Sequence, residues 1–293
     1  MAIANKLGVD VSQLPVAATT PEAAMEKAVS IGTWAVAMGL PPHVGVMPPV
    51  TGSPLANQHG ATMSIVDHIY RMSSTFMPLR RFSHDAAFGL EMLILYSFKK
   101  DRNTLALIRR IKRESDLFLT ADEAFLLHSL ARTQRQLAGD MAELGVYKGG
   151  SARLICEAKG RVPLHLFDTF DGLPEPGDKD DGFFKQGMVT GRFGAVRNYL
   201  KSYESVFFYP GLFPGNLQPV QDKLFSFVHL DVDLYQGTFS GLEFFYPRMS
   251  AGGIILTHDY QYPGVRKAFA EFFQGQPGQV VELGNSQCMA IKR

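Results

Sequence analysis

Short apolar runs alternate with helix-length amphipathic segments throughout the second half of this chain. Seven such runs follow residue 141: Ala142–Val146, Leu164–Phe167, Val206–Tyr209, Phe225–Leu230, Gly253–Leu256, Val280–Leu283 and Cys288–Ile291. Runs of four to six apolar residues separated by helical patterns are typical of strands joined by crossover helices. The pattern therefore predicts an α/β fold built on a mostly parallel sheet with crossover helices, and ligands are expected beyond the carboxyl ends of the strands.

The first half of the chain has helical periodicity instead. Helices are predicted at 21–39, 62–74, 84–99, 101–115 and 120–138. The last of these opens with Thr120 followed three residues later by Glu123, which is a capping-box pattern. Five prolines, together with Gly52, indicate a linker or an irregular surface segment at 40–56.

Composition and charge exclude several classes of partner. Hydrophobic residues make up 46% of the chain, charged residues 19%, and the formal net charge is +1, so bulk charge gives no reason to expect a nucleic-acid partner. The run 86–98 is too short to span a bilayer, and 1–14 lacks a secretory pattern. With only two cysteines, Cys156 and Cys288, we expect a cytoplasmic protein with no membrane partner.

A glycine-rich turn follows the first predicted strand. It runs from Glu143 to Ser151 and contains Gly145, Gly149 and Gly150. Glycines let the backbone approach a ligand, and the following helix start offers free N–H groups. The dinucleotide fingerprint would have a glycine where Glu143 stands; a carboxylate there suits the ammonium group of a cofactor such as S-adenosylmethionine. The alternative is a tight turn in an unrelated fold.

Asp168 follows the second run, some twenty residues after the glycine turn. A carboxylate at the tip of this strand can accept two hydrogen bonds from a ribose diol. The alternative is a local role, in which Asp168 makes an Asx-turn or caps a helix.

Acidic residues also follow the fourth and fifth runs. Asp231 and Asp233 are two residues apart and could face the same way, and Asp259 follows the neighbouring strand. Three carboxylates would suit Mg²⁺, and the adjacent His258 admits a softer divalent ion. In the competing interpretation, Asp231 and Asp259 are structural caps and His258 is only a hydrogen-bonding partner.

Six blocks of sequence, in this order, resemble the macrocin O-methyltransferase (TylF-type) family over roughly 118–293. They span residues 142–151, 167–174, 209–214, 229–235, 252–260 and 263–268. The resemblance implies a class I S-adenosylmethionine-dependent methyltransferase with a Rossmann-like, seven-stranded, doubly wound sheet and a divalent metal, Mg²⁺ above all. The acceptor would be a small molecule, with the methyl group going to a hydroxyl of a sugar or catechol-like group in a secondary metabolite.

The resemblance also assigns roles to individual residues. The cofactor would be held by the glycine turn and by the ribose ligand, that is by Glu143, Gly145, Val146, Tyr147, Gly149, Ser151 and Asp168. Asp231 and Asp259 would bind the metal, and Asp233 would be the general base. The family usually has two acidic residues where this chain has His258 and Asp259, so His258 is a candidate for a third metal ligand, for the base, or for a sign that metal dependence is lost.

Other interpretations stay open on the sequence alone. The same turn could serve a nicotinamide-dependent oxidoreductase, or the chain could be a non-catalytic accessory protein that keeps the fold. The segment 174–200 is predicted to be a lid, with Phe183, Phe184 and Arg192 facing the acceptor. Residues 1–117 form a predicted helical extension that caps the acceptor site, makes a homo-oligomer contact, or does both.

Overall fold

The computed structural model describes residues 77–98, 100–275 and 280–293, which belong to one compact unit, Met77–Arg293. The predicted helices at 21–39 and 62–74 and the predicted linker at 40–56 lie outside the described residues.

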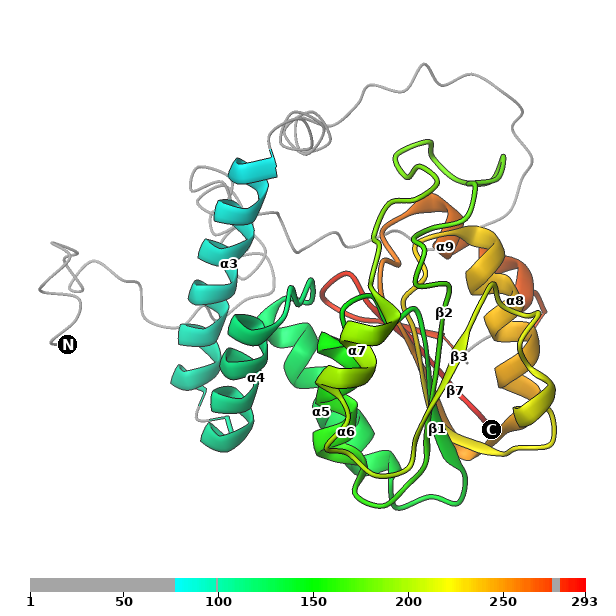
Figure 1. Cartoon of the computed structure of the whole chain (residues 1–293), viewed down its shortest axis with the longest axis horizontal. Helices are drawn as coiled ribbons and strands as arrows, with labels where there is room; N and C mark the ends of the chain where they lie inside the picture. The colour runs from blue at the N-terminus through cyan, green and yellow to red at the C-terminus, as the bar shows by residue number, and fades with distance from the viewer. Residues whose placement is uncertain (1–76, 99, 276–279) are drawn as a thin grey trace, which may run out of the picture. The chain divides into compact units, whose positions relative to one another are not determined.

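A seven-stranded sheet with the order β3-β2-β1-β4-β5-β7-β6 forms the centre of this unit (Figure 1). Strands β1 to β5 are parallel, whereas β7 pairs antiparallel with both β5 and β6. This arrangement confirms the predicted doubly wound, mostly parallel sheet. The strands are β1 (Asp140–Leu144), β2 (Leu164–Asp168), β3 (Val206–Pro210), β4 (Phe225–Leu230), β5 (Met249–Thr257), β6 (Val280–Glu282) and β7 (Cys288–Ile291).

Helices cover both faces of the sheet. Helices α5 and α6 pack together on one face, and α8 and α9 pack together on the other (Figure 1). The helices are α3 (Met77–Ser97), α4 (Arg102–Glu114), α5 (Ala121–Gln134), α6 (Gly150–Lys159), α7 (Phe193–Tyr199), α8 (Tyr235–Phe245) and α9 (Pro263–Phe272), with short 3₁₀ turns at Gln218–Val220 and Tyr246–Arg248. Among the described helices, none has the length and apolar character that a bilayer crossing requires.

Two apolar clusters fill the space between sheet and helices. The first cluster lies between the sheet and the helices α3, α4, α5 and α6. The second is rich in phenylalanine and lies between the sheet and the helices α8 and α9. All six residues of β4 are buried, because this central strand is covered on both faces. Because β1, β4 and β5 are neighbouring parallel strands, their carboxyl ends lie side by side at the same end of the sheet. A site at this end is built on backbone that the sheet holds in place.

The start of α5 ties the helical layer to α3. The capping box predicted from Thr120 and Glu123 is present, with Thr120 N donating to Glu123 Oε2 at 2.9 Å. Glu91 of α3 accepts a second hydrogen bond at this helix start, from Ala121 N at 2.7 Å. Burial raises the pKa of Glu91 from 4.5 to about 7; the Ala121 hydrogen bond opposes this, and the Asp122 and Glu123 carboxylates add to it.

We expect Glu91→Gln to remove a pH dependence of stability. Between pH 4.5 and 7 the folded protein holds a proton on Glu91 that the unfolded chain has lost, so stability falls as pH rises through this window. Glutamine cannot ionise but keeps an oxygen for Ala121 N–H. The urea midpoint of the variant, measured relative to that of wild type, should therefore be higher at pH 8 than at pH 5. If the midpoints of the two proteins change with pH in parallel, the assignment is wrong.

Candidate active site

The glycine turn after β1 lies directly against the end of β4. Gly145 has φ +89°, and a Cβ added there would lie 1.8 Å from the carbonyl oxygen of Asp231. The two segments are also joined by a hydrogen bond from Asp231 N to Leu144 O at 2.8 Å. Gly149, with φ +82°, forms the N-cap of α6. Only glycine fits such an approach and such a conformation, so the turn and the first predicted metal ligand are fixed relative to one another.

Asp168, at the tip of β2, braces the same turn. Its Oδ2 accepts hydrogen bonds from Val146 N at 2.7 Å and from Tyr147 N at 2.9 Å. Its Oδ1 accepts from Phe170 N at 2.6 Å, which is an Asx-turn. The local role considered for Asp168 is therefore real, and binding of a ribose diol by this carboxylate remains a prediction.

Glu143 is fully buried in β1, where its Oε1 lies 2.9 Å from His229 Nδ1. Burial raises the pKa of the Glu143 carboxyl, and His229 opposes that rise. The sequence predicted Glu143 as a ligand of a cofactor ammonium group. His229, to which sequence reasoning gave no role, is the partner that the structure provides.

The structure brings together the three residues predicted to bind a metal. Asp231, His258 and Asp259 each offer one ligand atom, and these atoms lie within 4.8 Å of one another. His258 Nδ1 is 3.1 Å from Asp231 Oδ1 and 2.9 Å from Asp259 Oδ2. Two carboxylates and an imidazole nitrogen at this spacing fit a divalent cation of the Mg²⁺, Mn²⁺ or Zn²⁺ kind. The role of the cluster as a metal site stays a prediction.

Asp233 lies beside this cluster with an unusual backbone. Both Asp233 (φ +61°) and Asp259 (φ +60°) adopt the left-handed conformation, which is costly for residues other than glycine and is found most often at functional sites. Burial raises the pKa of Asp233 well above its ordinary value, and the Asp259 and Asp231 carboxylates add to the effect. Asp233 thus faces the carboxylates of the predicted metal ligands, as a base acting on a coordinated hydroxyl would have to.

The opposite side of His258 faces a carboxylate that sequence reasoning linked only to helix capping. Glu123 Oε2 lies 3.5 Å from His258 Nε2. Burial alone would lower the pKa of His258, but the Asp259, Asp231 and Glu123 carboxylates raise it well above the ordinary value. The capping-box pattern identified Glu123, but no local signal could have shown that it reaches the end of β5.

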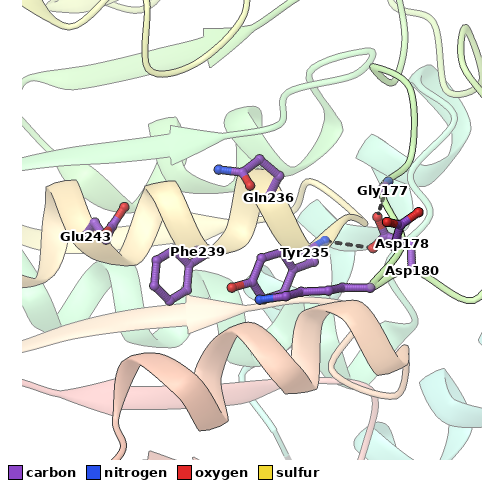
Figure 2. Close-up of a pocket in the computed structure, with 8 residues that line it drawn as sticks. Gly177, Asp178, Asp180, Tyr235, Gln236, Phe239 and Glu243 are labelled. Carbon is purple, nitrogen blue, oxygen red and sulfur yellow. Dashed lines mark hydrogen bonds between the residues drawn. The ribbon is translucent and has the colours of Figure 1, made fainter.

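The predicted lid segment is docked on α8 and α9. Asp180 Oδ1 accepts from Tyr235 N at 2.9 Å, as Figure 2 shows, and Lys179 forms an ion pair with Glu271 at 2.8 Å. A hollow of about 440 Å³ lies there, away from the acidic cluster. Its lining combines the loop with the outer face of α8: Gly177, Asp178, Lys179, Asp180, Tyr235, Gln236, Phe239 and Glu243.

The three lid residues predicted to face the acceptor lie in two different environments. Phe183 and Phe184 pack against Tyr262, with ring centroids 5.7 and 4.8 Å away. Arg192 is exposed at the N-cap of α7. Contact of these residues with an acceptor remains a prediction.

The geometry can now be compared with known proteins. Residues 127–280, more than half of the 293-residue chain, match the macrocin-O-methyltransferase (TylF) family. The chain belongs to this family.

Two curated relatives are O-methyltransferases. The chain is 29% identical over 150 residues to the 8-demethyl-8-(2,3-dimethoxy-alpha-L-rhamnosyl)-tetracenomycin-C 4'-O-methyltransferase of Streptomyces olivaceus, with 46% of this chain and 58% of the relative covered. It is 30% identical over 156 residues to the demethyldecarbamoylnovobiocin O-methyltransferase of Streptomyces niveus, with the same coverage. The chain thus spans little more than half the length of these macrocin-O-methyltransferase-like relatives.

Solved structures share the fold. The O-methyltransferase NovP superposes with a TM-score of 0.51 at 21% identity, covering 60% of this chain and 81% of NovP. The calicheamicin methyltransferase CalS11 gives a TM-score of 0.52 at 18% identity, with 66% and 93% covered. A Bacillus cereus O-methyltransferase in complex with SAH gives 0.50 at 14% identity, with 71% and 99% covered.

The beginning of the chain matches a different family. Residues 1–63 match the Prismane/CO dehydrogenase family. Over 52 residues the chain is 65% identical to carbon monoxide dehydrogenase 2 of Carboxydothermus hydrogenoformans, which covers 18% of this chain but only 8% of that enzyme. Helical periodicity at 21–39 gave no indication of this likeness, because periodicity reports secondary structure rather than ancestry.

Proposed function

We propose that this protein is an S-adenosylmethionine-dependent, divalent-metal-assisted O-methyltransferase. Its acceptor would be a small molecule, methylated on a hydroxyl of a sugar or catechol-like group in a secondary metabolite. The observation that carries the proposal is the contact between Gly145 and Asp231. Through it, the turn expected to hold the methyl donor adjoins the cluster expected to hold the acceptor.

The relatives support this choice of chemistry. Two curated relatives are O-methyltransferases whose names specify a rhamnosyl tetracenomycin and a novobiocin precursor. A structural neighbour was solved in complex with SAH, the product that S-adenosylmethionine leaves after methyl transfer. Family membership favours a methyltransferase over a nicotinamide-dependent oxidoreductase for this chain. The residue at position 143 favours the same choice, because Glu143 replaces the first glycine of the dinucleotide fingerprint.

Each residue of the site then has a task. Asp231, His258 and Asp259 would hold the cation, which when bound supplies a Lewis acid that lowers the pKa of an acceptor hydroxyl. Asp233 would take the proton of that hydroxyl as the methyl carbon moves to the oxygen. The glycine turn and Asp168 would align the sulfonium donor, and alignment of this kind is a large part of the rate in bimolecular reactions.

The experiment is a binding and turnover assay on the full chain. We expect calorimetry to detect S-adenosylmethionine but not NADH, and methyl transfer from labelled donor to a panel of nucleotide sugars and catechols. EDTA and Asp231→Ala should each abolish turnover, and added Mg²⁺ should restore it only in the EDTA-treated wild type. Absence of donor binding, or turnover that survives EDTA, would refute the proposal.

Localisation and assembly remain sequence-based expectations. We retain a cytoplasmic location, and a homo-oligomer contact through the N-terminal helices, as parts of the proposal.

A further inference from the structure

The two ring nitrogens of His258 face different carboxylates. Nδ1 lies 3.1 Å from Asp231 Oδ1 and 2.9 Å from Asp259 Oδ2, whereas Nε2 lies 3.5 Å from Glu123 Oε2. A histidine that binds a metal through one ring nitrogen keeps a proton on the other nitrogen, and the hydrogen bond made by that proton fixes which nitrogen is free to bind. The carboxylate at Nε2 therefore bears directly on whether Nδ1 presents a lone pair to the cluster.

Glu123 is itself held firmly. Its side chain is 3% exposed. Its Oε1 accepts hydrogen bonds from Ser286 N, at 3.2 Å, and from Ser286 Oγ, while its Oε2 accepts from Thr120 N at 2.9 Å. Contacts from α5 and from the turn between β6 and β7 fix this carboxylate on the far side of His258, so little side-chain freedom is left to lose when His258 is oriented.

The groups around Glu123 suit a carboxylate. Thr120 N, Ser286 N and Ser286 Oγ all donate hydrogen bonds to it. A buried carboxylate of this kind can accept the ring N–H of a histidine ligand, as carboxylates do behind histidines in metal centres.

We propose that Glu123 is a positioning residue for metal binding by His258. By accepting a hydrogen bond from Nε2–H, it holds the ring in the tautomer whose Nδ1 lone pair points between Asp231 and Asp259. This inference rests on the proposed metal-assisted function. It extends the site to α5, a helix that precedes β1 in the chain.

The neighbouring Asp122 offers a matched control. It occupies the same helix start and binds the same turn, accepting from Asn285 Nδ2 at 3.0 Å and from Thr120 Oγ1 at 2.7 Å. Neither of these two contacts of Asp122 involves His258. A role limited to capping α5 or anchoring the β6–β7 turn should therefore make Asp122→Asn and Glu123→Gln behave alike.

The test measures Mn²⁺ affinity of the full chain by electron paramagnetic resonance of the free ion, independently of turnover. We expect Glu123→Gln and Glu123→Ala to weaken Mn²⁺ binding by about 10-fold or more, and Asp122→Asn to stay within about twofold of wild type. Equal affinities in wild type and Glu123→Gln would overturn the inference alone. Absence of Mn²⁺ binding in wild type would overturn it together with the proposed metal site.

A measurement on wild type covers the case in which the Glu123 variants do not fold. Histidine ¹⁵N chemical shifts with Mg²⁺ or Zn²⁺ present should show His258 protonated at Nε2 and unprotonated at Nδ1. The opposite tautomer would overturn the inference.

Discussion

Replacing Asp233 with asparagine is expected to lower kcat for methyl transfer by about 10²–10⁴-fold, the range that a positioned general base contributes. Asparagine keeps the size of the side chain but cannot take a proton. Calorimetry should show unchanged S-adenosylmethionine affinity, because Asp233 is not among the residues expected to hold the donor. The loss should appear in kcat, measured from labelled methyl groups transferred to an acceptor found by the panel described above.

Asp171→Asn is the control for this experiment. Asp171 is an exposed aspartate just beyond the tip of β2, and its substitution should leave kcat within about twofold of wild type, as surface changes usually do. Near-normal turnover in Asp233→Asn would remove Asp233 from the role of base and direct attention to His258. It would not disturb the assignment of Asp231 and Asp259, which rests on their geometry.

The strands were predicted well because their apolar runs are short and bounded by turns. The predicted runs Phe225–Leu230 and Cys288–Ile291 coincide with β4 and β7. The prediction for β5 was too short: the strand begins at Met249, before Gly252 and Gly253, because backbone pairing with β4 continues where the apolar run does not. Pairing partners are a tertiary property that a local pattern does not contain.

The acidic cluster was predictable for a topological reason. In a parallel sheet, residues after neighbouring strands meet at one edge, so Asp231 and Asp259 could be placed together once β4 and β5 were recognised. The contacts of His258 with Glu123 and of Glu143 with His229 were not predicted. Each joins side chains from elements far apart in the sequence, and a local pattern does not report contacts between such elements.

The division of the chain at residue 118 stays a prediction. The family match covers 127–280, which lies within the predicted methyltransferase domain. For 1–117, the match of 1–63 to the carbon monoxide dehydrogenase family adds information that neither periodicity nor composition provides. The role predicted for 1–117, a cap on the acceptor site or a homo-oligomer contact, stays a prediction.

Replacing Gly145 with alanine is expected to reduce the free energy of unfolding by at least about 3 kcal/mol, as backbone strain and a steric clash combine. The new Cβ would lie 1.8 Å from the Asp231 carbonyl oxygen and 2.6 Å from its carbonyl carbon, and φ of +89° is itself unfavourable for alanine. Relief requires β1 and β4 to move apart at their carboxyl ends. The folded fraction of Gly145→Ala should therefore also bind Mn²⁺ more weakly than wild type, because Asp231 moves with the backbone.

Gly275→Ala separates the two contributions. Gly275 has φ +78°, but no heavy atom lies within 4 Å of a Cβ added there, so only the left-handed conformation is penalised, by about 1–2 kcal/mol. Urea unfolding of both variants, followed by circular dichroism, measures the difference. Equal losses would mean that the β1 turn and the end of β4 are not in contact in solution, and the link between donor turn and metal cluster would then have no structural basis.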